Sequence, residues 1–363
     1  MKADAFPSGD IFCHVVDNFG DIGITWRLAR QLGNEFGIKM RLVVDDLFSL
    51  QKLVPATNPH KDEQQIEGVA VHRWHRSIAL APSDLVIEAF GCELPAPYIA
   101  AMAAAPRPPV WLNLEYLSAE SWVDGHHLLP SIHPPTGLHK YFFFPGFGAN
   151  TGGLLRERGL FAQRDRFMHD RKKQTGGLKV FIFAYPNSAL PALLGALEVT
   201  ASAGPGLRCT IPAGALADHA RKLATRLNLF LPAFVAQQDF DEMLWSQDIL
   251  FVRGEDSFIR AQWAAKPFIW QIYPQTEGVH WAKLDAFLDL YCAGLATAPA
   301  GALRRLTHAW NAEDKAGLAA AWDGFMAQSG ALQEHAIWWA EELAKSPDLA
   351  TNLVTFYRKT AKI

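Results

Sequence analysis

The chain has 363 residues, half of them hydrophobic and a fifth charged, and this length exceeds what one hydrophobic core usually serves, so we expect two domains. A formal net charge of -3 gives no general attraction to nucleic acid or membrane, and no apolar run is long enough to span a bilayer. Four scattered cysteines without metal-ligand spacing, and a first segment without the apolar core of a signal peptide, predict a reduced, cytoplasmic protein.

The first predicted unit is a strand over residues 11–16, the turn DNFGDIG, and a helix over residues 24–36. This order imitates the opening of a dinucleotide-binding fold, but Asp17 and Asp21 stand where a pyrophosphate needs bare glycines. Two carboxylates at this point favour a cationic or proton-bearing substrate. The alternative is structural, with Asp21 capping the helix and Asp17 holding the turn.

Further strands over residues 40–44, 84–89 and 109–114 alternate with helices, and they predict a doubly wound α/β domain over residues 1–160. The loops at the carboxyl edge of its sheet would carry an acidic rim made of Asp17, Asp21, Glu88, Glu93 and Glu115. Residues 161–177 are polar and charged, and they are expected to be the linker to the next domain.

A second α/β series over residues 178–335 contains a βαβ unit, with strands over 249–252 and 267–273 around a helix over 257–265. Ligands of open parallel sheets bind at the carboxyl ends of the strands, so the turn over residues 253–256 is the first candidate site. Either Asp256 or Ser257 is expected to cap the helix.

The chemistry of this turn suits a diphosphate, because the free backbone N–H groups and the dipole of a helix start both favour an anion. Arg253 would add a charge-assisted contact. The Glu255 carboxylate would repel a phosphate, so it is expected to accept hydrogen bonds from sugar hydroxyls or to balance developing cationic charge. The alternative is a capped surface helix on which Arg253 and Glu255 pair.

The triplet DFD at residues 239–241 is similar to the acidic triplet that holds a metal in some glycosyltransferases. It precedes an amphipathic helix, so we expect it to cap that helix and to present Phe240 or Gln237 to a pocket, with no metal bound. Residues beyond 281 are predicted to be helical, and the last segment, 336–363, is expected to pack back on the first domain.

Two Rossmann-like doubly wound domains that face each other across a cleft, with a C-terminal helical tail, form the architecture called GT-B. Diphosphate features fall in the second domain and acidic features in the first, so the cleft would bring a nucleotide-sugar donor against a carboxylate. Fold alone also permits an epimerase or a two-domain binding protein.

Three stretches carry a resemblance: DNFGDIG with WRLARQL, NLEYLSAESW, and RGEDSFIRAQWAAKPFIWQIYPQ. In this order they resemble the bacterial arginine rhamnosyltransferases of elongation factor P, over most of the chain except residues 51–79, 161–177 and 300–330. The resemblance implies inverting transfer of L-rhamnose from dTDP-β-L-rhamnose to one arginine on the KOW-like N-terminal domain of elongation factor P. The modified factor would relieve ribosomes stalled at consecutive prolines. A monomer without a cofactor is expected.

Carried onto this chain, the resemblance implies a catalytic group of Asp17, Asp21 and Glu255, a diphosphate site of Arg253, Asp256 and Ser257, and a thymidine site of Phe183 or Tyr185 with Gln237, Phe240 and Tyr273. Which of Asp17 and Asp21 takes the proton stays open. Two rival functions remain: a GT-B transferase or epimerase that uses another nucleotide sugar on a small-molecule acceptor, and a non-enzymatic module that binds a translation factor.

Overall fold

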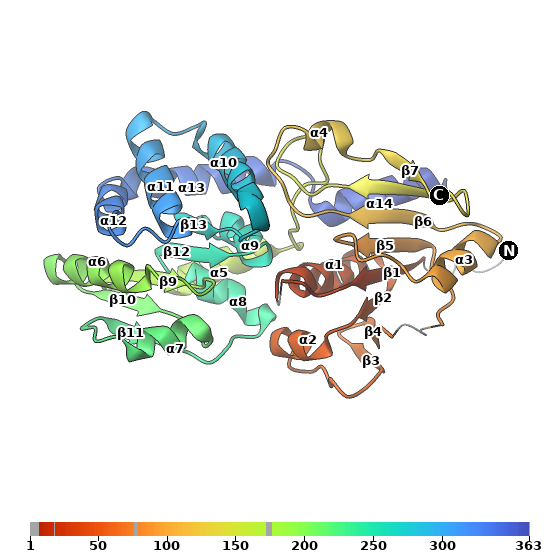
Figure 1. The fold of residues 1–363 in the computed structure, drawn as a ribbon, viewed down its shortest axis with the longest axis horizontal. Helices are drawn as coiled ribbons and strands as arrows, with labels where there is room; N and C mark the ends of the chain where they lie inside the picture. Colours follow the sequence, from red (N-terminus) through yellow and green to blue (C-terminus); the bar gives the residue numbers. More distant parts are fainter. Residues whose placement is uncertain (1–6, 18, 76–78, 172–175, 363) are drawn as a thin grey trace. The chain divides into compact units, whose positions relative to one another are not determined.

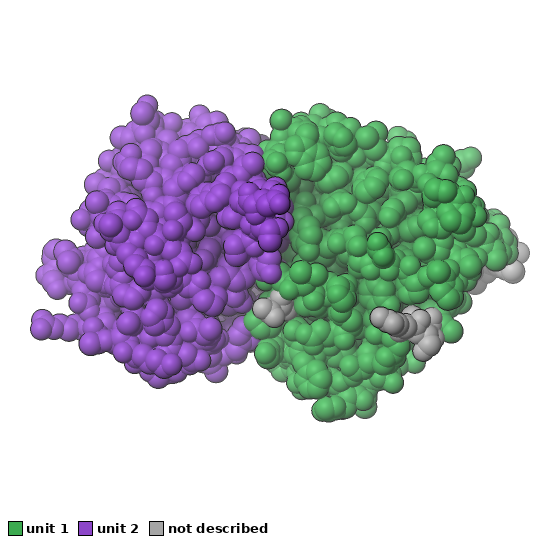
Figure 2. All heavy atoms as spheres, viewed as in Figure 1, with its two compact units in different colours: residues 1–158, 346–363 green, residues 159–345 purple. Residues whose placement is uncertain are grey.

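The computed structural model describes residues 7–17, 19–75, 79–171 and 176–362. The chain forms two compact units, drawn in separate colours in Figure 2. Unit 1 comprises Met1–Arg158 and Ser346–Ile363, and unit 2 comprises Gly159–Lys345. The chain therefore passes from one unit to the other after Arg158 and again after Lys345, whereas the sequence suggested divisions near residues 160 and 335.

Unit 1 is built on a sheet whose described strands have the order β3-β4-β2-β1-β5-β6-β8-β7 (Figure 1). Neighbouring strands are parallel except for the pairs β3 with β4 and β7 with β8. The strands are β1 (Ser8–Cys13), β2 (Lys39–Val44), β3 (Glu63–Ile66), β4 (Val69–Arg73), β5 (Leu85–Ala89), β6 (Val110–Leu114), β7 (Pro130–Ile132) and β8 (His139–Phe143).

The described helices of unit 1 are α1 (Gly20–Phe36), α2 (Leu47–Leu53), α3 (Ala96–Ala104), α4 (Val123–His126) and α14 (Leu349–Ala361). Helix α1 begins at Gly20, four residues before the predicted start, so the second half of the DNFGDIG turn is already helical. Its buried side chains include Ile22, Trp26 and Leu28.

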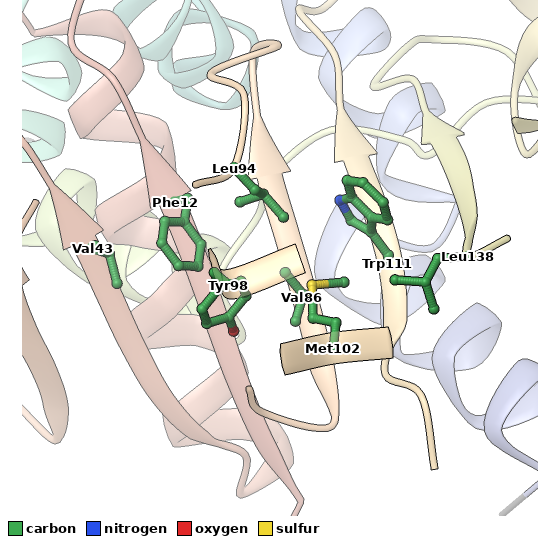
Figure 3. Packing of buried hydrophobic residues seen from close by; sticks show 8 residues of the cluster. All are labelled: Phe12, Val43, Val86, Leu94, Tyr98, Met102, Trp111 and Leu138. Carbon is green, nitrogen blue, oxygen red and sulfur yellow. The ribbon is translucent and has the colours of Figure 1, made fainter. Parts of the chain in front are cut away.

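Helix α3 covers one face of this sheet, where a cluster of buried side chains packs beneath it (Figure 3). The parallel register places Phe12 beside Val43 and Val86 beside Trp111, so all four side chains point to the same face. Tyr98 and Met102 of α3 pack onto them. Each such large apolar side chain contributes about 1.5–3 kcal/mol when fully buried. The remaining members of the cluster are Leu94 and Leu138.

The same register removes Glu88 from the predicted acidic rim. Glu88 lies inside β5 beside Phe12, so it points to the α3 face and is only 3% exposed. Its Oε2 accepts a hydrogen bond from Trp111 Nε1 (3.1 Å) and lies 3.3 Å from the ammonium of Lys140. The expected rim position was wrong because the side chain sits within the strand and not in the loop that follows it.

The C-terminal segment belongs to unit 1 because polar contacts join it to α1. Gln31 Nε2 donates to Asp348 Oδ1 (3.1 Å) and to the carbonyl of Arg156 (2.8 Å). Helix α14 packs against α1 and β6. The part of the tail that returns to unit 1 thus begins at Ser346, ten residues later than expected, and α13 stays in unit 2.

Unit 2 has a parallel sheet whose described strands have the order β11-β10-β9-β12-β13. The strands are β9 (Leu178–Ile182), β10 (Leu207–Thr210), β11 (Asn228–Phe230), β12 (Ile249–Arg253) and β13 (Phe268–Gln271). The described helices are α5 (Leu160–Arg171), α6 (Leu190–Ala203), α7 (Ala215–Lys222), α8 (Gln237–Trp245), α9 (Asp256–Ala264), the 3-10 helix η1 (Thr276–Gly278), α10 (Val279–Cys292), α11 (Thr297–Asn311), α12 (Leu318–Met326) and α13 (Ser329–Ala344).

The expected linker over residues 161–177 is helix α5 for most of its described length. Its ring contacts explain the difference: Phe161 packs edge-on against Trp263 (5.9 Å between ring centres), and Phe167 packs against Trp245 (5.7 Å). Scattered charges hid this apolar face in the sequence. In the described parts of the chain, no helix combines the length and the hydropathy needed to cross a bilayer.

Candidate active site

The loop between β1 and α1 is held by the side chain of Asp21. This residue lies in the first turn of α1 and is only 2% exposed. Its Oδ2 accepts hydrogen bonds from the backbone N–H groups of Val16 (2.8 Å) and Asp17 (2.9 Å). The carboxylate therefore closes the loop that precedes the helix. It is not the N-cap, which is Phe19, where no side-chain hydrogen bond is made.

The surroundings of Asp21 raise the pKa of its carboxyl group above the ordinary aspartate value. Burial is the main cause, and the negative charge of Asp17 adds to it. The two backbone N–H groups and a hydrogen bond from the Tyr116 hydroxyl act in the opposite direction. Tyr116 is itself fixed by stacking on Phe90, with ring centres 4.4 Å apart. A carboxylate with raised proton affinity is better suited to accept a proton near neutral pH.

Asp17 is half-buried, and the position of its carboxylate depends on the small size of Gly20, three residues later. Its carbonyl oxygen accepts a hydrogen bond from the N–H of Gly20 (2.7 Å). A Cβ atom on Gly20 would lie 2.5 Å from Asp17 Oδ2, closer than non-bonded atoms approach. With a side chain at position 20, the Asp17 carboxylate would have to move from its place over the start of α1.

Two further residues near this loop escaped the sequence reasoning. Tyr116 lies within the NLEYLSAESW stretch, but no spacing rule links it to Asp21. His14 follows β1 and forms an ion pair through Nδ1 with Asp45 when protonated, and Asp45 Oδ1 also accepts from the N–H of Val15 (3.0 Å). Asp45 directly follows the predicted second strand, which was the available signal.

In unit 2, the predicted nucleotide residues gather where β9, β12 and β13 end. Arg253, the last residue of β12, places its guanidinium carbon 4.7 Å from the ring centres of both Phe183 and Tyr185. The Tyr185 ring packs edge-on against Tyr273 (5.5 Å), and the Phe183 ring packs against Phe240 (5.3 Å). One cluster therefore combines the cation with all four aromatic side chains, and the rings hold the guanidinium in place.

The turn after Arg253 is closed by Ser257. The hydroxyl oxygen of Ser257 accepts from the N–H of Arg253 (3.0 Å), and the hydroxyl donates to the carbonyl of Arg253 (2.5 Å). The predicted cap at Asp256 or Ser257 was wrong, because the N-cap of α9 is Glu255 and no side chain makes a capping hydrogen bond there. The side chain of the N-cap residue thus does not occupy the backbone N–H groups at the start of α9, which suits an anion site.

The carboxylate of Asp256 organises the neighbouring helix. Its Oδ2 accepts from Gln237 Nε2 (3.0 Å) at the start of α8 and from Arg260 Nε (3.2 Å). Arg260 is 4% exposed and donates through Nη1 to Asp241 (2.6 Å). Arg260 is a third residue that sequence reasoning missed, although its i,i+4 spacing from Asp256 was a usable signal.

The DFD triplet therefore acts differently from the expected cap. Asp241 pairs with Arg260, and Asp239 lies inside the first turn of α8, whose N-cap is Ala236 without a side-chain hydrogen bond. The triplet does present Phe240 to the aromatic cluster. Across the described ranges, no three His, Cys, Asp or Glu side chains come together as a metal-binding group.

The predicted site residues thus form two sets, one in each unit. Asp17 and Asp21 share the loop before α1 in unit 1. The residues of unit 2 lie in or beside β9, α8, β12, α9 and β13, and they are Phe183, Tyr185, Gln237, Phe240, Arg253, Glu255, Asp256, Ser257 and Tyr273.

Comparisons with known proteins place this arrangement in a family. Residues 9–358 match the family model described as Elongation-Factor P (EF-P) rhamnosyltransferase EarP. The chain is 45% identical to a protein-arginine rhamnosyltransferase of Pseudomonas putida, over 97% of this chain and 98% of the relative. A protein of the same name from Neisseria meningitidis serogroup B is 35% identical, with 97% of each chain covered.

Solved structures agree. One described as "Structural basis for EarP-mediated arginine glycosylation of translation elongation factor EF-P" is 33% identical, with a TM-score of 0.63, and the match covers 97% of this chain and 99% of that one. The spinosyn rhamnosyltransferase SpnG in complex with thymidine diphosphate is 12% identical, with a TM-score of 0.51 and coverage of 97% and 100%. The second likeness bears on the fold alone, and with the other glycosyltransferases matched it confirms the predicted GT-B fold.

Proposed function

The chain belongs to the family of elongation factor P arginine rhamnosyltransferases, and we propose that it transfers L-rhamnose from dTDP-β-L-rhamnose to an arginine side chain on the KOW-like N-terminal domain of elongation factor P. It is an enzyme of the glycosyltransferase class. The structural observation that carries the proposal is the buried carboxylate of Asp21, which suits a guanidinium acceptor.

The acceptor chemistry explains why a carboxylate is needed. A guanidinium is protonated at any cytoplasmic pH, with a pKa above about 12, so its nitrogens are poor nucleophiles. Asp21 would hold the planar group and orient one nitrogen, and it would take the proton late, once carbon–nitrogen bonding has made it acidic. Its raised pKa supports this role, and Asp17 would support that geometry or hold the arginine.

The donor chemistry assigns the residues of unit 2. Inversion places the attacking nitrogen opposite the leaving dTDP, and an oxocarbenium-like transition state releases negative charge onto the diphosphate. Arg253 and the backbone N–H groups at the start of α9 would receive that charge, so the proposal needs no metal and no cofactor. Ser257 and Asp256 would act by holding the turn and Gln237 in place.

The remaining roles complete the assignment. Phe183, Tyr185, Phe240 and Tyr273 would enclose the thymidine together with Gln237. Glu255 would balance the positive charge that develops on the sugar. We further propose a cytoplasmic monomer that binds neither nucleic acid nor membrane, and whose modified partner relieves ribosomes stalled at consecutive prolines.

Intact-mass analysis tests the reaction directly. Elongation factor P incubated with the protein and dTDP-rhamnose should gain the mass of one deoxyhexosyl group, and that gain should disappear when the acceptor arginine is replaced by lysine. An unmodified partner that nevertheless forms a stable complex would favour the non-enzymatic module instead.

Glu255→Gln tests the donor assignment. We expect dTDP still to raise the melting temperature of this variant, because the diphosphate contacts remain, while transfer falls about 100-fold or more. Melting temperatures measured in parallel with UDP-, GDP- and dTDP-sugars test the rival function, a transferase or epimerase that uses another nucleotide sugar. Stabilisation by UDP- or GDP-sugars alone would reject the thymidine site.

A further inference from the structure

Unit 2 contains a cavity of about 470 Å³ that is lined by helices α5 and α13 and by the end of α9. This volume lies in the range of about 300–1,000 Å³ typical of small-molecule sites. Phe161, Arg164 and Met168 come from one face of α5, with helical spacing. None of the lining residues belongs to the proposed donor site or to the loop before α1.

Small residues create the space. Ala264 and Ala340 are each only 2% exposed and form the floor, and Ala265 and Ala344 line the walls. Ile337 is 44% exposed and lies at the rim with the exposed Glu341. The body of a ligand would therefore meet mainly apolar atoms, which favours an aromatic or branched aliphatic group.

The charged residues of the cavity differ in how they are held. Arg164 donates through Nη1 to the carbonyl of Trp263 (2.9 Å), pairs with Asp165 (3.2 Å), and lies over the ring of Phe161. Gln333 donates to the carbonyl of Ala265 (2.9 Å). The polar groups around the end of α9 are thus already bonded to one another.

Lys266 is different. Within the described ranges, its ammonium has no hydrogen bond to another residue and no carboxylate within ion-pair distance. Burial lowers the pKa of this lysine, and Asp248 acts on it only from beyond that distance. An anion placed in the cavity would supply the missing partner of a partly buried cation.

We propose that this cavity is a binding site for a small apolar monoanion, namely a carboxylate or sulfonate on an aromatic or branched aliphatic body, whose charged group pairs with Lys266. Glu341 at the rim adds a negative charge, so we expect a dianion such as a phosphate ester to bind more weakly than a monoanion. The site is separate from the residues that the donor and the acceptor arginine would contact.

Isothermal titration of the full chain with three matched probes tests whether the cavity prefers a negatively charged ligand. Naphthoate, naphthylmethanol and naphthylmethylamine share one ring system and differ in charge. We expect naphthoate to bind at one site per chain, at least ten times more tightly than the alcohol, and the amine to bind most weakly. Equal affinities for the three probes, or no naphthoate binding at millimolar concentration, would overturn the proposal.

Variants locate the site. Lys266→Met should reduce the naphthoate affinity to that of the alcohol, and Ile337→Glu at the exposed rim should weaken it several-fold through added negative charge. Lys315→Met, an exposed lysine of unit 2 outside the cavity, should leave binding unchanged. Circular dichroism and the melting temperature check folding independently of any transfer activity. Unchanged naphthoate affinity in both cavity variants would reject this location.

Discussion

At the scale of single residues, the structural contacts of Asp21 are compatible with the catalytic role that we propose for it. Its carboxylate holds the loop before α1 through the N–H groups of Val16 and Asp17, and the same burial raises its pKa. A structural and a chemical role are compatible here because one oxygen, Oδ2, accepts both backbone hydrogen bonds. Tyr116 supplies a further hydrogen bond from the loop after β6.

Replacing this carboxylate with an amide separates the two tasks. Asp21→Asn should keep the loop, because the amide oxygen can accept the same two backbone hydrogen bonds. Transfer should fall about 100- to 10,000-fold, the usual contribution of a general base. The rate of rhamnosyl transfer reports the base role of Asp21, and the melting temperature reports its role in holding the loop. Asp62→Asn, at an exposed aspartate of unit 1, is the matched control and should retain activity. Near-normal transfer by Asp21→Asn would show that Asp21 is not the base.

The raised pKa of Asp21 also predicts a pH dependence. Transfer needs the ionised form, so kcat/KM should decline as the pH falls through a value above about 3.9, the ordinary aspartate pKa. The folded state keeps its proton at a pH where the unfolded chain has lost it, so the contribution of Asp21 to stability decreases as the pH rises through that interval. The difference in unfolding free energy between Asp21→Asn and the parent should therefore favour the variant more at pH 8 than at low pH. Urea titrations at several pH values measure this difference in unfolding free energy. A difference that did not change with pH would contradict a raised pKa of Asp21.

At the scale of elements, two helices depend on contacts that are distant in sequence. The sequence of helix α5 resembles a charged linker, but its aromatic side chains pack against Trp245 of α8 and Trp263 of α9. The N-cap of helix α14 is Asp348, whose Oδ1 accepts from the N–H of Thr351 (3.1 Å) and from Gln31 of α1 (3.1 Å). The N-cap of α14 therefore also attaches the C-terminal segment to unit 1.

Removing that cap should destabilise unit 1. Asp348→Ala loses the capping hydrogen bond and leaves Gln31 without one of its acceptors, so we expect a loss of about 1–2 kcal/mol in unfolding free energy. In urea titrations the midpoint should fall while the slope stays unchanged. Asp323→Ala, on the exposed face of α12, makes the same chemical change outside a cap and should alter stability by less than about 0.5 kcal/mol. Equal effects of the two variants would argue against the capping role of Asp348.

At the scale of the whole molecule, each unit has its own sheet and its own buried core, and the polypeptide passes between the units twice. The proposed catalytic aspartates belong to unit 1, and the proposed nucleotide residues belong to unit 2. Under this proposal the acceptor arginine binds unit 1 and the nucleotide binds unit 2. A ligand that binds one unit should therefore stabilise mainly that unit.

Hydrogen exchange with and without dTDP tests this division. At about 100 times its dissociation constant, dTDP should stabilise the binding state by about 2.7 kcal/mol. Slower exchange is expected in β12, in the first turn of α9 and in the segment over residues 183–185, with UDP as the comparison ligand. Protection confined to the loop before α1, with none in unit 2, would contradict the donor site.

Hydrophobic periodicity and motif order along the chain were sufficient to predict the GT-B fold and the βαβ unit around β12, whereas the site residues stay a prediction. Those signals are local, because strand and helix patterns repeat within a few residues. The cap at Asp256 or Ser257, the cap at the DFD triplet, the start of α1 and the rim position of Glu88 were predicted wrongly, since each depends on which group a side chain meets after folding. Only the tertiary structure placed Arg253 between Phe183 and Tyr185 and set Tyr116 against Asp21, because strand register and burial join residues that no spacing rule connects.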